Sequence, residues 1–447
     1  MTPARAHIAL ASALARLAVG AALLLAAIGW RTPVLAGWRP LALAILIAGP
    51  LALLVIEWRL RRCADGRLGA AVRLAAVAAA GLALATTLVI ETTFRRDRSV
   101  VLDAEPERLE RLGRHVMVGY RDLADLRVLI ERKGIAGVFV TTRNVEGRKP
   151  AEIADTIAAL QAIRARQGLP PLWIATDEEG GVVSRLSPPL TRRPPLSSLL
   201  AGAAHAPAES EFAQAEGYGA AQGRELAALG INLNFAPVVD LNHRLVNPQD
   251  RYTRIYQRAI SDDPAVVTEV ARRYCAGLAR SGVACTLKHF PGLGRVFEDT
   301  HVGAAELSAD VPELDAADWI PFRKLMEKTS FTMLAHVRVS AIDRERPASL
   351  SRAVVAGLLR GSWRYDGILI TDDFSMGAIA GSRDGVGRAA VAALTAGVDL
   401  LLVSYDCDQY FPLMAALLEA DRAGRLASEV LASSDARLSR VSPPRRD

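Results

Sequence analysis

Cysteine is scarce in this chain of 447 residues, which contains only Cys63, Cys275, Cys285 and Cys407. None of them forms a CxxC pair, so the sequence indicates neither a disulfide framework nor a zinc site, and cysteine usage leaves the compartment open. The His-x-His pair that is usual after the first strand of metal-dependent barrel hydrolases is also missing, since His115 stands alone. We therefore expect no metal and no cofactor.

The sequence also lacks the marks of a nucleic-acid surface. The formal net charge is +6, but there is no lysine-rich tail and no basic stripe with interleaved aromatic residues. Many arginines instead border apolar runs, as charges that flank membrane spans do. We expect no nucleic-acid partner. Three histidines without evident partners are interpreted as structural or surface residues: His7, His205 and His243.

Apolar residues make up 51% of the chain, and the excess lies in roughly the first 95 residues. Three runs carry it: Leu17–Trp30, Leu41–Ile56 and Leu74–Ile90. A membrane span needs about 20 apolar residues, and the first run reaches that length only by including Arg16, which would have to snorkel. The pattern predicts a membrane anchor over residues 1–97 with two or three transmembrane helices. Buried core helices are a weaker alternative because the runs are apolar all round, and a signal peptide would explain only the first run.

The arginine distribution predicts an orientation. The loop after the second run carries five arginines, whereas the loop after the first carries Arg31 and Arg39. Short arginine-rich loops stay cytoplasmic, so we expect the large domain, residues 98–447, on the outer (periplasmic) side of the cytoplasmic membrane. Three arginines after the last run count against this and make the bias small. The five are Arg59, Arg61, Arg62, Arg67 and Arg73, and the three are Arg95, Arg96 and Arg98.

Beyond Arg98, short β-branched runs alternate with amphipathic helical stretches, which predicts a parallel sheet. The eight strand candidates are Val116–Tyr120, Gly137–Val140, Leu172–Thr176, Asn232–Pro237, Ala284–Lys288, Phe331–His336, Gly367–Thr371 and Val398–Val403. Eight units in about 350 residues predict an α/β fold of the (β/α)₈ TIM-barrel type. A doubly wound open sheet is the alternative, but no glycine-rich phosphate loop follows the first strand.

Barrel enzymes place their chemistry at the carboxyl ends of the strands, and polar residues gather at these points here. The seventh strand candidate runs into Asp372 and Asp373. One of these carboxylates could be a nucleophile, a base or a metal ligand, and an aspartate there could also cap a helix. We expect Asp372 to face the pocket and Asp373 to support it.

A glycine-rich and proline-containing loop follows the fifth strand candidate and contains Asp299 and His301. These two side chains lie two residues apart, so they point the same way in an extended loop. The carboxylate can hold the imidazole tautomer, which makes the pair a proton donor and acceptor near neutral pH. A surface histidine without a role is the alternative for His301 taken alone.

Six stretches, in order along the barrel, resemble glycoside hydrolase family 3, and specifically its bacterial β-N-acetylhexosaminidase branch. They are Asp177–Arg185, Asn234–Asp240, Lys288–Gly292, Asp299–His301, Ala335–Val337 and Ile370–Met376. Each stretch alone is weakly specific, but together they are highly specific. The membrane segment lies outside the resemblance.

The resemblance implies a role for each matching position. Asp372 would be the nucleophile of a retaining glycosidase, and His301, paired with Asp299, would be the acid/base. A second set would hold sugar hydroxyls: Asp177, Arg185, Arg258 (with Arg254 as a fallback), Lys288 and His289. The expected reaction releases β-linked N-acetylglucosamine, with peptidoglycan fragments as the expected carbohydrate substrate and the lipid bilayer as the partner of the anchor.

Three parts of the sequence depart from the family pattern, and these departures bear on the identity of the substrate more than on the type of reaction. Leu293 stands where the branch usually has histidine, Thr300 replaces serine, and the stretch Arg251–Ala259 lacks the usual glycine and phenylalanine. A β-glucosidase of the same family is the first alternative, but only about forty residues follow Val403, too few for the second domain of those enzymes. A catalytically inactive, membrane-tethered glycan-binding protein is the alternative from another class.

Overall fold

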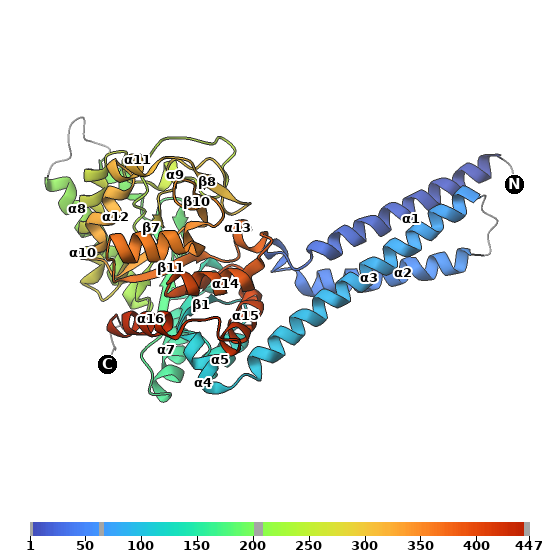
Figure 1. Cartoon of the computed structure of the whole chain (residues 1–447), viewed down its shortest axis with the longest axis horizontal. Helices are drawn as coiled ribbons and strands as arrows, with labels where there is room; N and C mark the ends of the chain where they lie inside the picture. Colours follow the sequence, from blue (N-terminus) through green and yellow to red (C-terminus); the bar gives the residue numbers. More distant parts are fainter. Residues whose placement is uncertain (1–2, 62–66, 201–208, 442–447) are drawn as a thin grey trace. The chain divides into compact units, whose positions relative to one another are not determined.

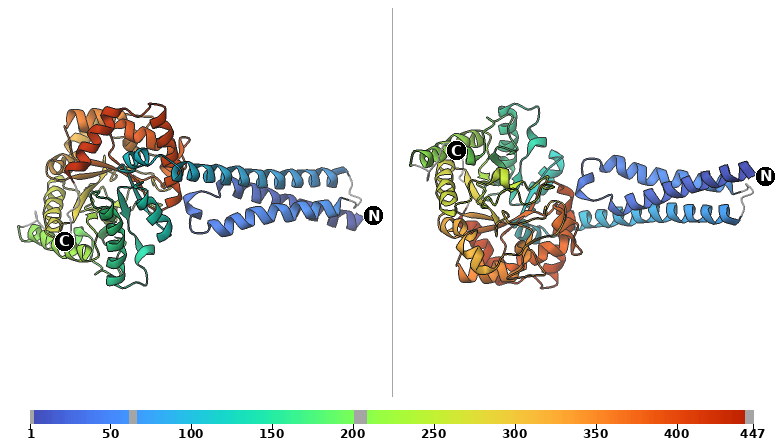
Figure 2. Two further views of the ribbon diagram at one scale, coloured as in Figure 1. Left: turned by 90° about the horizontal axis from the view of Figure 1, so that it is seen from below. Right: turned by 90° about the horizontal axis from the view of Figure 1, so that it is seen from above.

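The computed structural model describes residues 3–61, 67–200 and 209–441. The chain divides into two compact units, residues 1–100 and 101–447, and the boundary falls inside a long helix. The elements of both units are drawn in Figures 1 and 2. Cys63 and His205 lie outside the described residues.

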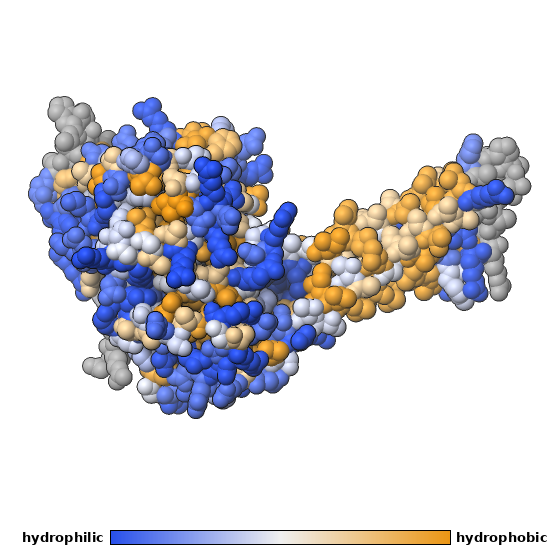
Figure 3. Space-filling view, viewed as in Figure 1, coloured by the Kyte–Doolittle hydropathy of each residue, from blue (hydrophilic) through white to orange (hydrophobic). Residues whose placement is uncertain are grey.

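Unit 1 consists of three long helices with one short 3-10 turn between the first two. They are α1 (Pro3–Gly29), η1 (Pro33–Leu35), α2 (Arg39–Leu60) and α3 (Arg67–Leu102). All three long helices are long and apolar enough to cross a membrane, with candidate spans of 23, 22 and 36 residues. Apolar side chains cover much of the visible face of this unit (Figure 3).

Ion pairs bound the apolar stretches of these helices on both sides. Toward one end, the Arg16 guanidinium lies 2.6 Å from the buried Glu57 carboxylate, and Arg73 lies 3.7 Å from the same carboxylate. Toward the other, Arg31 pairs with Glu91 at 2.7 Å. The sequence showed Arg16 as an isolated charge that would have to snorkel, whereas in the folded unit it is paired with Glu57 of the second helix.

Unit 2 is a closed eight-stranded barrel whose neighbouring strands all pair in parallel. The strands are β1 (Val116–Gly119), β2 (Gly137–Phe139), β3 (Trp173–Thr176), β6 (Leu233–Asn234), β7 (Ala284–Phe290), β9 (Phe331–Leu334), β11 (Ile368–Asp373) and β12 (Leu400–Val403). All eight predicted strands are present, so the predicted barrel is confirmed and the open sheet is excluded. Two small sheets sit beside it: β4 (Glu178–Gly180) with β5 (Val183–Ser184), and β8 (Ala305–Leu307) with β10 (Val337–Val339).

Helices surround the barrel (Figures 1 and 2). Their starts follow local capping rules: Asp263 accepts hydrogen bonds from the first turn of α10, with proline at the first helical position. The elements are α4 (Pro106–Gly113), α5 (Leu123–Glu131), α6 (Thr142–Val145), α7 (Pro150–Arg166), η2 (Leu196–Leu200), α8 (Glu209–Ala228), α9 (Ile255–Arg258), α10 (Pro264–Ala279), α11 (Val311–Ala316), α12 (Trp319–Met326), η3 (Ala348–Leu350), the π-helix η4 (Ala353–Ser362), α13 (Gly377–Ala380), α14 (Gly385–Ala396), η5 (Cys407–Gln409), α15 (Tyr410–Arg422) and α16 (Ser428–Arg440).

The barrel interior is a packed core. Residues two apart on the same strand point inward together, as the strand repeat requires. Phe331 and Met333 illustrate this on β9, and Ile368 and Ile370 on β11. Leu438 of α16 packs against the same cluster, so the described residues after β12 pack onto this barrel.

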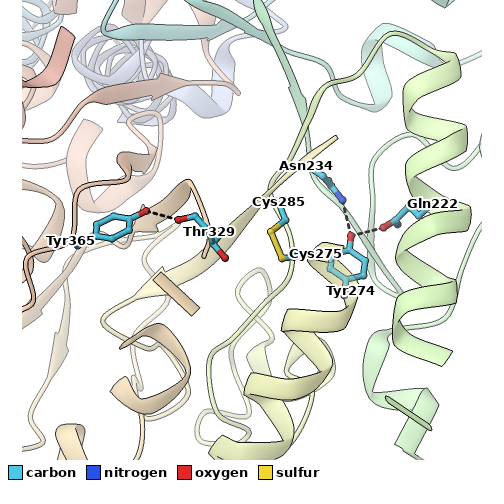
Figure 4. The surroundings of a disulfide bond; sticks show 7 residues. All are labelled: Gln222, Asn234, Tyr274, Cys275, Cys285, Thr329 and Tyr365. Atoms are coloured by element: carbon cyan, nitrogen blue, oxygen red, sulfur yellow. Dashed lines mark hydrogen bonds between the residues drawn. A yellow bond between two sulfur atoms is a disulfide. The ribbon is translucent and has the colours of Figure 1, made fainter. Parts of the chain in front are cut away.

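A disulfide joins Cys275 of α10 to Cys285 of β7 (Figure 4). The sequence indicated no such bond, because the two cysteines show none of the usual spacings. The packing of α10 against β7 brings them together. Beside the bridge, the buried Tyr274 hydroxyl bonds to Gln222 and Asn234 (Figure 4).

Candidate active site

Asp372 lies near the carboxyl end of β11, on a strand that is otherwise buried. Its Oδ1 accepts the backbone N–H of Asp373 at 2.8 Å. Burial by itself raises the pKa of Asp372, but the imidazoles around it, His289 foremost, outweigh this effect and hold the pKa below its usual range. The carboxylate is therefore ionised at neutral pH.

Asp373 has a supporting role, as expected. Its two carboxylate oxygens accept hydrogen bonds from the backbone N–H groups of Ser375, Ser404 and Tyr405 and from the Ser404 hydroxyl, at 2.7 to 2.9 Å. These four hydrogen bonds occupy the acceptor sites of the Asp373 carboxylate and connect the end of β11 to the segment after β12. Asp372 is left as the carboxylate available to a ligand.

Asp299 and His301 form the expected pair. Asp299 Oδ1 lies 2.8 Å from His301 Nδ1 and also accepts the His301 backbone N–H at 2.9 Å. Burial raises the pKa of Asp299, but the bonds from His301 outweigh it, so the pKa stays well below its usual range. The His301 side chain is 41% exposed, compared with 9% for Asp299, which leaves the imidazole accessible to a ligand.

The loop that carries this pair is tied to the segment after Asp372. The backbone N–H of Gly377 donates to His301 O at 2.9 Å, and that of Ala378 donates to Thr300 O at 3.1 Å. A side chain at Gly377 would meet Val302 O at 2.3 Å and His301 O at 2.8 Å, so only glycine permits this approach. These contacts bring the Asp299–His301 pair beside β11.

A buried charge network lies at the ends of β3 and β7. Lys288 Nζ lies 2.6 Å from both Asp177 Oδ1 and Glu179 Oε1. Arg258 forms a bidentate salt bridge with the Glu179 carboxylate, with N···O distances of 2.7 and 2.9 Å. Burial raises the pKa of Glu179, but Arg258 and Lys288 outweigh it and lower the pKa far below its usual range.

His289 extends this network to β6. Its Nδ1 lies 2.8 Å from Asp240 Oδ2, and its Nε2 lies 3.2 Å from Arg258 Nη2. The ring orientation is thus fixed from both sides.

Residues 108–441 match the family described as "Glycosyl hydrolase family 3 N terminal domain". The chain belongs to glycoside hydrolase family 3. It is a glycosidase, and its relatives include proteins named "Beta-hexosaminidase". One from Pseudomonas aeruginosa is 34% identical over 63% of this chain and 79% of its own length. One from Xanthomonas oryzae is 36% identical over 69% of this chain and 86% of its own.

Solved structures agree with this family assignment. A glycoside hydrolase family 3 β-N-acetylglucosaminidase from Paenibacillus has a TM-score of 0.67 and 35% identity, and the match covers 74% of this chain but only 61% of that longer one. The M. tuberculosis protein LpqI has a TM-score of 0.65 and 30% identity, with 78% and 97% covered. Both matches support a single family 3 barrel in this chain.

Within this family 3 barrel, the structure gathers most of the predicted site residues. The nucleophile candidate, the proton-transfer pair and the buried charge network contain seven of them: Asp372, Asp299, His301, Lys288, Asp177, His289 and Arg258. Arg185 is exposed, and the side chain of Arg254 takes no part in these contacts. Among the described residues, no three His, Cys, Asp or Glu side chains are grouped as metal ligands. His243, expected to lack a partner, lies 3.0 Å from the buried Asp318, which makes it structural.

Sequence reasoning did not assign three contributors to the site. Glu179 and Asp240 both follow predicted strands, where barrel enzymes place their chemistry. Glu179 is also two residues from the predicted ligand Asp177, so both could have been proposed from the sequence. Thr253, whose hydroxyl donates to Asp299 at 2.9 Å, gave no signal, because it lies in the stretch that departs from the family pattern.

Proposed function

We propose that this protein is a retaining β-N-acetylhexosaminidase that removes β-linked N-acetylglucosamine through a covalent glycosyl-enzyme. The observation that carries the proposal is the ionised, partly exposed Asp372 carboxylate beside a backbone-tethered Asp299–His301 pair. Asp372 attacks the anomeric carbon while His301 protonates the leaving oxygen. Water, deprotonated by the same imidazole, then releases the sugar with retained configuration.

The charge network provides the sugar site. Lys288, Asp177 and Arg258 are held by buried partners, so their polar groups are fixed before a sugar arrives, and His289 is oriented by Asp240. Such preorganisation reduces the entropy lost on binding. The test is turnover of nitrophenyl N-acetyl-β-glucosaminide by the full-length protein in detergent, with the β-glucoside as the comparison. Binding without turnover would favour a glycan-binding protein, and preference for the glucoside would favour the β-glucosidase alternative.

Peptidoglycan fragments are the proposed substrate, and the rim of the barrel supports an acidic one. Arg121 follows β1 and Arg143 follows β2, and both guanidinium groups lie 5.4 Å from the Tyr405 ring centre. They donate to the Tyr405 carbonyl, and no described carboxylate lies within 4 Å of either. Burial and the neighbouring Arg121 lower the pKa of Arg143, and the charge of Asp373, next to the proposed nucleophile, partly opposes this. Release of N-acetylglucosamine from purified cell-wall fragments, identified by mass spectrometry, tests this substrate.

We place the barrel outside the cytoplasmic membrane. Charged residues bound each apolar stretch of unit 1: Arg16 and Arg31 are fifteen residues apart, whereas Arg39 and Glu57, and Arg73 and Glu91, are eighteen apart. At about 1.5 Å per residue this gives roughly 22–27 Å, close to the hydrocarbon thickness of about 30 Å. The arginine-rich connection between α2 and α3 then stays inside. The Cys275–Cys285 disulfide supports the same side, because such bonds persist in oxidising compartments.

Two measurements test the orientation. A reporter active only in the cytoplasm, fused after Asp447, should be silent, and a bright signal would overturn the proposed side. Thiol alkylation of the protein taken directly from cells should label Cys275 and Cys285 only after reduction. Labelling before reduction would remove the support that the disulfide gives.

A further inference from the structure

The segment of residues 250–258, between β6 and α10, departs from the family pattern and lies against the Asp299–His301 pair. Asp250 orders its turn by accepting the backbone N–H groups of Thr253 at 2.9 Å and Arg254 at 2.7 Å. Arg254 takes a φ of 41°, in the left-handed region. The turn is therefore held by specific bonds although it contains no glycine.

This turn presents two donors to Asp299. Thr253 Oγ1 donates to Asp299 Oδ1 at 2.9 Å and lies 3.4 Å from His301 Nδ1. The backbone N–H of Tyr252 reaches Asp299 Oδ2 at 3.2 Å, and the Tyr252 ring lies 5.8 Å from the His301 ring. Both Asp299 oxygens are thus fixed by groups outside the loop that carries the pair. Thr253 itself is buried, with 8% of its surface exposed.

The other end of the segment reaches the sugar site. Arg258 donates through Nη1 to the Thr253 carbonyl at 2.8 Å while its other nitrogens bind Glu179. Thr253 therefore links the charge network at β3 and β7 to the Asp299–His301 pair.

We propose that Thr253 is a positioning residue that fixes the Asp299 carboxylate, and through it the His301 imidazole, for proton transfer to the leaving group. This inference rests on the proposed function. The hydroxyl restricts rotation of the carboxylate, so Nδ1 of His301 keeps one partner and Nε2 stays directed to the substrate. A misdirected imidazole would slow only the steps that need a proton.

Full-length Thr253→Val and Thr253→Ser test the proposal, with kcat/KM measured on a nitrophenyl and an alkyl N-acetyl-β-glucosaminide. The alkyl glycoside needs protonation of its leaving group, whereas the nitrophenyl glycoside does not. Thr253→Val should lose roughly ten- to hundredfold on the alkyl substrate, the order expected for one hydrogen bond to a charged group, and little on the nitrophenyl one. Thr253→Ser should retain the parent values. Thr268→Val on α10, which loses a hydroxyl bond to Pro264 O, is the matched control and should leave both values unchanged.

A double variant separates positioning from a general structural effect. In a His301→Ala background, Thr253→Val should cause no further loss, because residues that act as one unit are not additive. Equal losses on both substrates, failure of Thr253→Ser to retain activity, or a further loss in the His301→Ala background would each overturn the inference. A parent protein that hydrolyses neither substrate would instead overturn the proposed function.

Discussion

Replacing Glu179 with glutamine tests whether the buried network holds the sugar site. Glu179 is only 6% exposed and is the shared partner of Arg258 and Lys288. Glutamine keeps the shape but removes the negative charge, so two cations are left with Asp177 as their nearest acid. We expect a less stable barrel and a lower kcat/KM, since Lys288 and Arg258 are then free to reorient.

The size of the effect follows from burial. Removing one partner of a buried ion pair costs about 3–5 kcal/mol, because the remaining charge is desolvated without compensation. For a unit that spans residues 101–447, an unfolding entropy of about 2.1 cal/mol/K per residue means that each kcal/mol shifts Tm by roughly 1.4 °C, so Glu179→Gln should lower Tm by about 4–7 °C. The same change at the exposed Glu345 is the control and should shift Tm by less than about 1 °C.

The sign of the pH dependence gives a second check. The folded-state pKa of Glu179 is depressed, so its contribution to stability is present above the unfolded pKa of about 4.3 and is lost as pH falls through the folded value. The Tm difference between parent and variant should therefore be constant between about pH 5 and pH 7 and shrink below about pH 4. Calorimetry that found no Tm difference at pH 7, or one that persisted unchanged in acid, would refute the electrostatic reasoning.

Three further variants test the proposed chemistry. Asp372→Asn should abolish turnover with an unchanged circular dichroism spectrum, and a 2-fluoro sugar should label Asp372 in the parent; a label on another carboxylate would contradict the assignment. His301→Ala should lose about 10²–10⁴-fold in kcat/KM on the alkyl glycoside and far less on the nitrophenyl one, and equal losses would exclude it as the acid. Gly377→Ala should displace the loop at Val302 and therefore reduce kcat/KM on the alkyl glycoside more than on the nitrophenyl one. Gly217→Ala is the control, because its added carbon has nothing within 4 Å. Equal activities of the two variants would argue that the contact of Gly377 with the loop does not position His301.

The barrel could be predicted from sequence because its signals are local. Each strand is a short apolar run, and each is followed by polar residues where it leaves the core, as in Ile368–Asp373. The Asp299–His301 pair could be predicted because side chains two residues apart in an extended segment point in the same direction. Family resemblance favoured Arg258 over Arg254 as a sugar ligand, and in the structure Arg258 is the one that joins the network with Glu179; its role as a ligand stays a prediction.

The features that sequence missed depend on contacts between distant segments. Cys275 and Cys285 show no spacing that signals a bridge, and only the packing of α10 on β7 brings them together. Thr253 reaches Asp299 across 46 residues of chain, through a turn that the family pattern does not describe. Such contacts depend on tertiary structure, which neither periodicity nor a motif encodes.

The Arg16–Glu57 pair bears on the number of membrane spans. A lone charged side chain within a span costs about 2.5–3.5 kcal/mol on insertion scales, and this cost made the first apolar run the weakest of the three. In the folded unit, Glu57 on α2 meets Arg16 on α1 at 2.6 Å, so each charge offsets the cost of the other. If α1 stayed outside the bilayer, Glu57 would keep only the longer contact to Arg73. Three inserted helices would therefore satisfy these charges better than two, and in the orientation proposed above, with the arginine-rich connection inside, the N-terminus would lie on the cytoplasmic side.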